Sequence, residues 1–390
     1  MSTSRSARLT PRVDPGLVVA LVLAATAAWP LLSHPSLPSG TDGIQHLYRA
    51  YEILAAWKEG VFYTRWAPDF YYGYGYPVFN YYAPLTYFLA AAYGALFGLV
   101  AGIKFGLVLA SFIGTLGVYL FGRDQWGPQA GIVSAAAYAL APYIALTDPV
   151  LRGAVPEVFA IGLGPVVLWS FWRLARTRAR GFFVLSVVSL AALILSHNLI
   201  SFAFAGLTGA FLIWDAALNR RPATWAGGVE ALASPLAAGL LAAGLTAFVW
   251  LPALRESGAV QYQNAFNFVQ VRRYTAASVL LAPGTARDAQ VFYSADINFR
   301  IGLPQWILGL LGALTVLWPS PQRRTTLFFA LVALIAFGLM VPQADPIWQR
   351  VTVLPYLQFS FRLLGVLVPC LAWLAGAAAH WFMARLSFAR

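Results

Sequence analysis

The chain has 390 residues, of which 60% are hydrophobic and only 10% are charged. Soluble globular proteins carry about 25% charged residues, so this composition excludes a water-soluble enzyme and a disordered chain. The net charge of +12 does not indicate a nucleic-acid partner, because the arginines are scattered along the chain. The single cysteine, Cys370, excludes an intramolecular disulfide framework and a cysteine-based zinc site. We therefore expect an all-α, polytopic membrane protein, with residues 1–390 forming one integral membrane domain.

Ten stretches are apolar enough to be membrane spans, each of which takes roughly 20 residues. They are 16–33, 103–121, 128–145, 157–172, 181–196, 198–216, 229–250, 303–318, 325–341 and 361–382. An eleventh stretch, 83–98, is apolar but shorter. Residues 181–216 hold no charge before Asp215 and are too long for one straight helix, so we expect a hairpin at Ser196-His197-Asn198.

The basic residues predict which side of the membrane each loop faces, since arginine and lysine favour the cytoplasmic side. The basic loops are 5–12, 173–180, 220–221, 323–324 and the tail after residue 384. They fall on one side only if 83–98 does not cross, so we expect a juxtamembrane or re-entrant helix there. Both termini are then cytoplasmic, and the long segments 34–82 and 252–300 face outward. Loops of that length are usually functional.

The first long segment begins with a helical pattern. Asp42, His46 and Arg49 share one face at helical spacing. An apolar stripe on the same helix is typical of a helix in the membrane interface; its members are Leu47, Ala50, Leu54 and Trp57. Asp42 has two compatible interpretations. It could cap the helix, with Gln45 completing a capping box, or it could accept a proton from a sugar hydroxyl or hold a divalent cation. His46 could be a second base, an orienting donor or a metal ligand.

Aromatic residues follow at high density: 13 of the 27 residues from Phe62 to Phe88 are aromatic. Most of these rings fit an interfacial aromatic belt. The same rings could also form the apolar walls of a cleft for a sugar or an isoprenoid chain. Glycine and proline residues punctuate the run and predict a shaped turn rather than a helix.

Glu157 begins an apolar stretch directly after a proline, which places a carboxylate close to the bilayer. It could simply favour the helix start through the macrodipole. An acid at membrane depth is costly, however, which favours a functional role. Arg152 could chelate phosphate oxygens with its fork of donors, or pair with Asp148 or Glu157. His197 and Asn198 could contact substrate or be ordinary turn residues.

The second long segment carries mixed charge, which fits a solvated face. Within it, Arg272 and Arg273 could clamp a phosphate leaving group. Glu256, at the start of the segment, is a candidate substrate-binding residue. Arg362 begins the last span, where it could bind substrate or snorkel to the interface.

Several of these motifs together resemble a known family. They are Asp42-Gly43 with His46, Arg65-Trp66, Gly73-Tyr74-Gly75-Tyr76-Pro77, Tyr82-x-Pro84-Leu85, Arg152-Gly153-Ala154 with Glu157, Ser196-His197-Asn198, Leu251-Pro252-Ala253 with Glu256, and Gln358-Phe359 with Arg362. The set is similar to the pyruvoyl-tetrahydropterin-synthase-related membrane proteins and, more broadly, to the GT-C superfamily of membrane glycosyltransferases.

The resemblance implies a GT-C-like fold with juxtamembrane helices in the first outer loop and an acidic residue just after the first span. It also implies a second acidic position in the second outer loop, which Glu157 fits. GT-C enzymes transfer a sugar, in most cases from a polyprenyl-phosphate carrier, to an acceptor outside the cytoplasm. Arg65 and Tyr76 lie in the shared motifs and are candidate substrate-binding residues.

The resulting hypothesis is sugar transfer at the outer face of the cell membrane. Asp42 acts as base on a glycan, lipid or protein acceptor, with Glu157 as its partner and arginines around the phosphate. The donor and the surrounding membrane lipids are the other partners. A divalent cation, Mg or Mn, held by Asp42, His46 or Glu157 is left open, because no spacing demands one. The alternatives are a lipid or glycan transporter and a non-catalytic membrane scaffold. Acids at span ends and the lack of a visible repeat favour the enzyme over the transporter.

Overall fold

The computed structural model of the protein describes residues 14–38, 40–219, 225–261, 274–284 and 297–388. These residues form helices joined by turns, together with one isolated β-bridge between Ala67 and Tyr76. The predicted all-α class is therefore confirmed.

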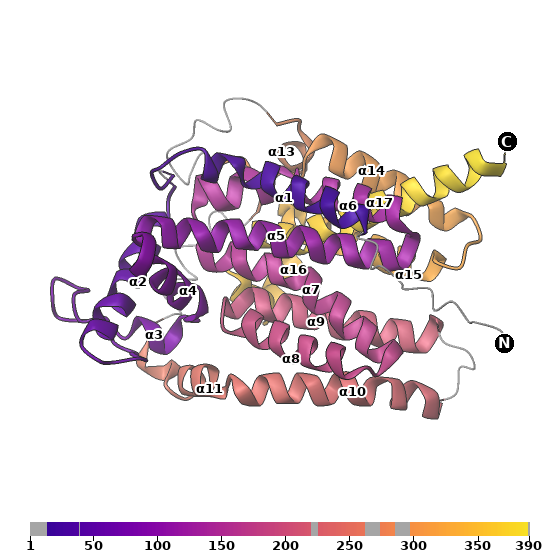
Figure 1. Ribbon diagram of the computed structural model, residues 1–390. Coiled ribbons are helices and arrows are strands. Elements are labelled where there is room, and N and C mark those ends of the chain that lie inside the picture. The colour runs from indigo at the N-terminus through magenta and orange to yellow at the C-terminus, as the bar shows by residue number, and fades with distance from the viewer. Residues whose placement is uncertain (1–13, 39, 220–224, 262–273, 285–296, 389–390) are drawn as a thin grey trace, which may run out of the picture.

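Long helices lie side by side and make the body of the molecule (Figure 1). They are α1 (Pro15–Leu32), α5 (Leu99–Trp126), α6 (Pro128–Ala139) continued by the π-helical η1 (Tyr143–Arg152), α7 (Val155–Thr177), α8 (Arg180–Ile194), α9 (Asn198–Trp214), α10 (Trp225–Leu245), α14 (Leu303–Leu314), α15 (Arg323–Met340) and α17 (Leu364–Phe388). Each of the ten predicted stretches coincides with one of these helices.

The number of helices that could span a membrane, judged by their length and composition, is lower than the ten predicted from the sequence. Among the described residues, seven helices are long and apolar enough to cross a membrane. An eighth span results if α10 and α11 (Ala247–Arg255), which are bent by 67° relative to each other, are taken together. The count of about ten is thus not confirmed. The 15 residues of α8 rise only about 22 Å, less than the ~30 Å hydrocarbon core.

Two local predictions can be compared directly with the helix bounds. The hairpin at 196–198 is present, because α8 ends at Ile194 and α9 begins at Asn198. The stretch 83–98 forms α4 (Leu85–Phe97), whose 13 residues rise about 20 Å. That length fits a helix that does not cross completely.

Smaller elements gather at one end of the bundle, on the left of Figure 1. There α2 (Gly43–Lys58) packs on α4, and α3 (Val78–Tyr81) contacts α11. The remaining short elements are η2 (Asp215–Asn219), η3 (Ser257–Ala259), α13 (Ala277–Leu281), η6 (Thr315–Leu317), η7 (Pro342–Ala344), α16 (Asp345–Arg350), η8 (Leu354–Leu357) and η9 (Ser360–Leu363).

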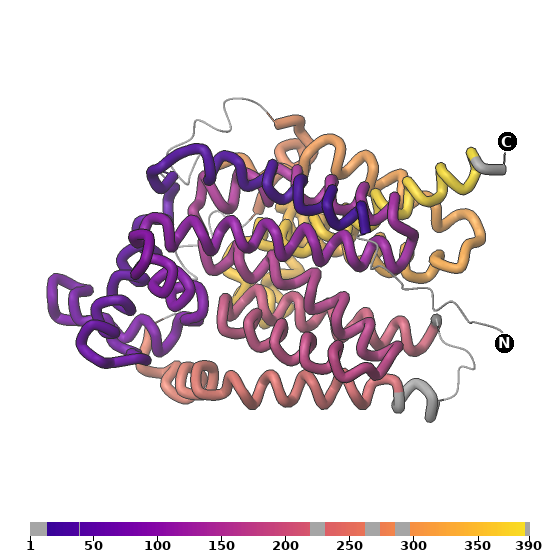
Figure 2. The backbone as a smooth tube through the Cα atoms, in the orientation of Figure 1, coloured from indigo at the N-terminus to yellow at the C-terminus, as the bar shows by residue number. Residues whose placement is uncertain are grey.

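The opposite end holds the start of α1 and the end of α17 (Figure 2). The connection between α7 and α8, which carries the basic residues of 173–180, lies at the same end (Figure 1). Asp14 ties α1 to α5 there, since its carboxylate accepts from the Arg123 guanidinium at 3.0 Å. The loop 173–180 therefore lies at the same end of the bundle as the start of α1 and the end of α17. The basic loops 5–12 and 220–221 lie outside the described residues, and the cytoplasmic side of all the basic loops stays a prediction.

Glycines allow two of the long helices to pack backbone against backbone. A Cβ added to Gly312 of α14 would overlap the carbonyl oxygen of Leu374 in α17. In a membrane the apolar solvent gives little drive to associate, so close van der Waals contact of this kind holds helices together. The α14–α17 pair therefore depends on a residue without a side chain.

Replacing Gly312 by alanine is expected to lower the melting temperature of the purified protein, by a destabilisation of about 1–3 kcal/mol, because α14 and α17 must move apart. Gly206→Ala on α9 is the matched control. No atom lies within 4 Å of a Cβ built there, and alanine is the better helix former. Equal melting temperatures for the two variants would show that the α14–α17 contact is not tight.

Candidate active site

Two loops far apart in sequence meet at the end of the bundle that carries α2. The backbone N–H of Asp42 donates to the carbonyl oxygen of Arg152 at 2.7 Å. A Cβ on Gly40 would come within 2.9 Å of the Arg152 carbonyl carbon. Gly153 has φ +67, and a Cβ there would lie 3.0 Å from the Cα of Gly43. The glycines on both sides thus let Asp42 and Arg152 approach, which explains why glycine flanks each of them.

Glu157 lies at the centre of a buried polar cluster at this meeting point. Its side chain is 2% exposed, and the residue lies in the first turn of α7. Arg152 Nη1 lies 3.0 Å from Oε1, and Arg362 Nε donates to Oε2 at 3.1 Å. The Tyr143 hydroxyl donates to Oε1 at 3.1 Å, and His197 Nε2 lies 4.0 Å from Oε2. Residues from η1, α7, η9 and the α8–α9 hairpin are therefore joined through one carboxylate.

Arg152 also pairs with Asp148, one turn earlier in η1. Both partners weighed for Arg152 from the sequence are thus present together. The two buried arginines, Arg152 and Arg362, face two buried carboxylates, Asp148 and Glu157, so their charges are balanced within the cluster. Such a cluster is a rigid, neutralised support.

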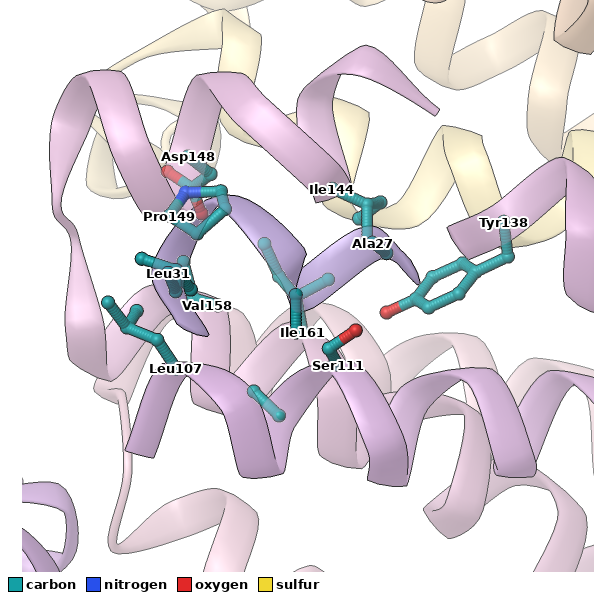
Figure 3. A pocket seen from close by; sticks show the side chains of 12 residues that line it. Ala27, Leu31, Leu107, Ser111, Tyr138, Ile144, Asp148, Pro149, Val158 and Ile161 are labelled. Atoms are coloured by element: carbon teal, nitrogen blue, oxygen red, sulfur yellow. The ribbon is translucent and has the colours of Figure 1, made fainter. Parts of the chain in front are cut away.

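Asp148 of this cluster also lines a small cavity (Figure 3). Its volume is about 20 Å³, room for one water molecule. Asp148 and Tyr138 both line it, together with apolar residues of α1, α5 and α7. The Oδ2 atom of Asp148 is buried without a protein hydrogen-bond partner.

Asp42 occupies the rim of the cluster. It stands at the N-cap position of α2, but its side chain makes no capping hydrogen bond, so the predicted capping box with Gln45 is not formed. Instead Oδ2 lies 3.9 Å from Nη2 of Arg152, and the side chain is 39% exposed. Asp42 is therefore an accessible carboxylate held beside a buried cation.

His46 and Arg49 follow on the buried face of α2, as the predicted helical face requires. Both reach Tyr87 of α4: Arg49 Nη1 donates to the hydroxyl at 2.9 Å, and His46 Nδ1 lies 3.0 Å from it. The Arg49 guanidinium also lies 4.1 Å from the centre of the Tyr82 ring. Among the described residues Arg49 forms no ion pair within 4 Å. It is a buried cation with none of the described carboxylates within ion-pair distance.

The pKa of His46 falls from the ordinary 6.5 to about 3, first because of burial and then because of Arg49. The other charged or titratable groups that act on it are His197, Arg152 and Glu157. His46 is thus a neutral imidazole at physiological pH, and its Nδ1 is in position to accept a hydrogen bond from the Tyr87 hydroxyl.

This lowered pKa predicts acid sensitivity. Between pH 6.5 and about 3 the unfolded chain binds a proton at His46 and the folded chain does not, so stability falls with pH by about 1.4 kcal/mol per unit in that window. Above pH 7 this contribution is constant. We expect the melting temperature to drop from pH 7 to pH 5, and to drop less in His46→Gln, which cannot titrate. Parallel pH curves for the two proteins would contradict a neutral, buried His46.

Two predicted substrate-binding residues hold the first long segment to α11 instead of joining the Glu157 cluster. Arg65 Nη2 donates to the carbonyl oxygen of Phe248 at 3.2 Å. Glu256 Oε2 accepts from the Asn80 amide at 2.8 Å. Both side chains therefore link the first long segment to α11 and its C-terminal end.

Asn198 and Tyr76 also make local contacts. The Asn198 amide donates to the carbonyl oxygen of Tyr81 at 2.8 Å, which links the start of α9 to α3. The Tyr76 ring stacks on Tyr71 with 5.5 Å between ring centroids. Arg272 and Arg273 lie outside the described residues.

The suggested metal ligands do not form a three-residue set. In the part of the chain that the structure describes, no three histidine, cysteine, aspartate or glutamate side chains are grouped so that they could hold a metal ion. The oxygens of Glu157 face Arg152 and Arg362 instead.

Sequence reasoning missed two members of the site, Tyr87 and Tyr143. Tyr87 belongs to the aromatic run and nothing in the pattern sets it apart from its neighbours. Tyr143 precedes Glu157 by 14 residues and reaches it only because η1 folds back onto the start of α7. Asp148 was weighed only as a partner of Arg152.

The bundle and the helices near its α2 end define a multi-pass membrane protein with a GT-C-like fold. The Archaeoglobus fulgidus oligosaccharyltransferase in its apo form is similar to it, with a TM-score of 0.62 and 14% identity over 96% of this chain and 51% of that one. A structure of the archaeal oligosaccharyltransferase AglB from the same organism, in complex with an inhibitory peptide and a dolichol-phosphate, has a TM-score of 0.55 and 15% identity over 96% and 51% of the two chains. ArnT from Cupriavidus metallidurans bound to undecaprenyl phosphate has a TM-score of 0.53 and 17% identity over 97% and 63%.

The chain belongs to the family of 6-pyruvoyl-tetrahydropterin synthase related domains, which are membrane proteins; the family model matches residues 79–385. A comparison with curated protein sequences finds no match. The chain spans between half and two thirds of the length of the solved structures that it resembles. At these identities the likeness shows a shared fold.

Proposed function

We propose that this protein is a membrane glycosyltransferase that transfers a sugar from a polyprenyl-phosphate-linked donor to an acceptor hydroxyl at the outer face of the cell membrane. In this proposal both termini are cytoplasmic, and the end of the bundle that carries α2 faces outward. Two solved structures with this fold contain a dolichol-phosphate and undecaprenyl phosphate, which supports a lipid phosphate as the donor's carrier.

The observation that carries the proposal is the position of Asp42. A half-exposed carboxylate lies 3.9 Å from an arginine that is itself fixed by two buried acids. The exposure lets an acceptor reach Asp42, and the buried support fixes where Asp42 stands. General bases are effective when they are held in this way within hydrogen-bonding reach of the hydroxyl.

The reaction then runs as a single displacement. Asp42 removes the proton from the acceptor hydroxyl, and that oxygen bonds to the anomeric carbon from the face opposite the phosphate. The bond between the anomeric carbon and the phosphate oxygen breaks, and the electron pair leaves with the polyprenyl phosphate. The configuration at the anomeric carbon is inverted.

Arg49 is the residue that we propose for the leaving phosphate. Arg152 and Arg362 are already neutralised by Asp148 and Glu157, whereas the charge of Arg49 is balanced by no carboxylate within 4 Å among the described residues. A cation in a site of low dielectric stabilises developing negative charge far more than it would in water.

Glu157 serves this site as a positioning residue rather than as a second base. Its oxygens accept from Arg152, Arg362 and Tyr143, so no lone pair is left poised for an acceptor hydroxyl. It fixes Arg152, which in turn lies next to Asp42.

The test is incubation of the purified protein, in lipid nanodiscs, with polyprenyl-phosphate sugars labelled in the sugar. A glycosyltransferase releases unlabelled polyprenyl phosphate and moves the label to an acceptor. A transporter moves the intact donor across proteoliposomes without cleaving it. A scaffold does neither, and either of these results would refute the proposal.

A further inference from the structure

The segment between α2 and α3 contains a short ordered hairpin, residues 66–76, which we call the aromatic hairpin. Ala67 and Tyr76 form an antiparallel bridge with N–H···O distances of 2.9 and 3.0 Å. The N–H of Gly75 donates to the carbonyl oxygen of Phe70 at 2.8 Å. The Trp66 ring covers Gly75 so closely that a Cβ there would overlap it. The hairpin is thus held by its own backbone and by a covering indole.

The tip of this hairpin exposes aromatic rings to an unusual degree. Tyr72 is 100% exposed, Tyr74 86% and Tyr71 66%. Tyr71 and Tyr72 have φ of 55 and 60, a left-handed conformation that is unfavourable for residues with a side chain. Unfavourable backbone of this kind is concentrated at functional sites, where the surrounding structure enforces it.

The segment between α2 and α3 projects past the end of the helical bundle, at the far left of Figures 1 and 2. Belt residues lie at the level of the lipid headgroups, alongside the ends of the spans. Exposed apolar rings that gather in one place mark an interaction site.

The tip itself, residues 71–74, has no charged side chain, and the charged residue of the hairpin is the exposed Asp69 at its base. The hairpin therefore carries no cation that would pair with a phosphate or a carboxylate, and the Asp69 carboxylate can accept hydrogen bonds from hydroxyl groups. Tyrosine offers an apolar ring face and a hydroxyl that donates and accepts hydrogen bonds. The matching ligand has apolar C–H faces and neutral hydroxyls in the same molecule, which is the chemistry of an uncharged sugar.

We propose that the aromatic hairpin is a binding platform for a neutral saccharide, which it holds as the acceptor for the reaction at Asp42. That the saccharide is an acceptor rests on the proposed function, whereas saccharide binding itself does not require sugar transfer. The platform and Asp42 belong to one continuous segment, with α2 between them. The rigid hairpin lets the rings stack on pyranose faces with little ordering cost.

The binding test uses neutral linear tetrasaccharides of mannose, glucose and galactose with the full-length protein in nanodiscs, followed by saturation-transfer NMR. We expect the wild type to bind at least one of them, and the Tyr72→Ala/Tyr74→Ala double variant to bind it at least tenfold more weakly. Tyr48→Ala, which removes another exposed ring (58%) from α2, is the control and should bind as the wild type does. No binding by the wild type, or equal binding by the double variant, overturns the proposal.

The two proposals fail separately in this design. An absence of sugar transfer in the wild type, with Tyr72-dependent binding retained, refutes only the glycosyltransferase. Transfer that keeps the wild-type KM for acceptor in the double variant refutes only the platform.

A depth measurement separates the platform from a membrane anchor. Cys370 is buried, so a fluorophore on Tyr72→Cys labels one position. Quenching by iodide in water, and none by doxyl-labelled lipids, is expected for a platform in solution. Quenching by the lipids would place the tip in the bilayer interface and overturn the proposal.

Discussion

The Asp42→Asn variant is expected to lose about 10²–10⁴-fold in sugar transfer, the contribution of a positioned general base. Asparagine has nearly the same shape as aspartate and keeps the backbone hydrogen bond to Arg152, but it cannot take the proton of the acceptor. The measurement is the initial rate of label transfer from a polyprenyl-phosphate sugar under saturating acceptor.

The fold of this variant should be intact, because the Asp42 side chain is 39% exposed and makes no capping bond. A melting temperature close to that of the wild type is the control. Glu59→Gln, an exposed acid at the other end of α2, should transfer at the wild-type rate. Undiminished transfer by Asp42→Asn would remove Asp42 as the base.

Glu157→Gln is expected to have the largest effect on stability. It removes the negative charge that pairs with both Arg152 and Arg362. Arg152 then keeps its ion pair with Asp148, and the buried Arg362 loses its ion pair with Glu157. Removing one partner of a buried ion pair costs about 3–5 kcal/mol. We expect a sharp fall in melting temperature and in the yield of folded protein.

The matched control is again Glu59→Gln, which changes the same charge in an exposed position. Glu157→Asp tests the geometry, because it restores the charge on a shorter side chain and should recover part of the stability. A Glu157→Gln protein as stable as the wild type would show that the cluster is not what holds η1, α7 and η9 together.

Much of the fold was predictable, because the positions of long apolar stretches predict which residues form membrane helices. All ten apolar stretches became helices, and the turn at 196–198 followed because Ser196-His197-Asn198 is the one polar turn in a stretch too long to cross once. The number of spans was not predictable in the same way. Whether a stretch such as 181–196 reaches across depends on how its ends pack, and its helix has only 15 residues.

The site was predictable in its members more than in their roles. A charged residue near a span end is rare enough to be singled out, and Asp42, Arg152 and Glu157 were identified on that ground. His46 and Arg49 were added because they share a helical face with Asp42, and the roles of all five stay predictions. Arg362 lies 205 residues from Glu157, and no local pattern shows that their side chains touch. The capping box failed for a similar reason, since the charge of Arg152, over a hundred residues away, attracts the Asp42 side chain.

We propose that the end of the bundle with Asp42 and Arg49 binds a lipid phosphate. A structure of the protein in nanodiscs with undecaprenyl phosphate is the decisive measurement. We expect the phosphate within hydrogen-bonding distance of the Arg49 guanidinium, beside the Asp42 carboxylate. A phosphate bound at the opposite end of the bundle, next to Arg123, would contradict it.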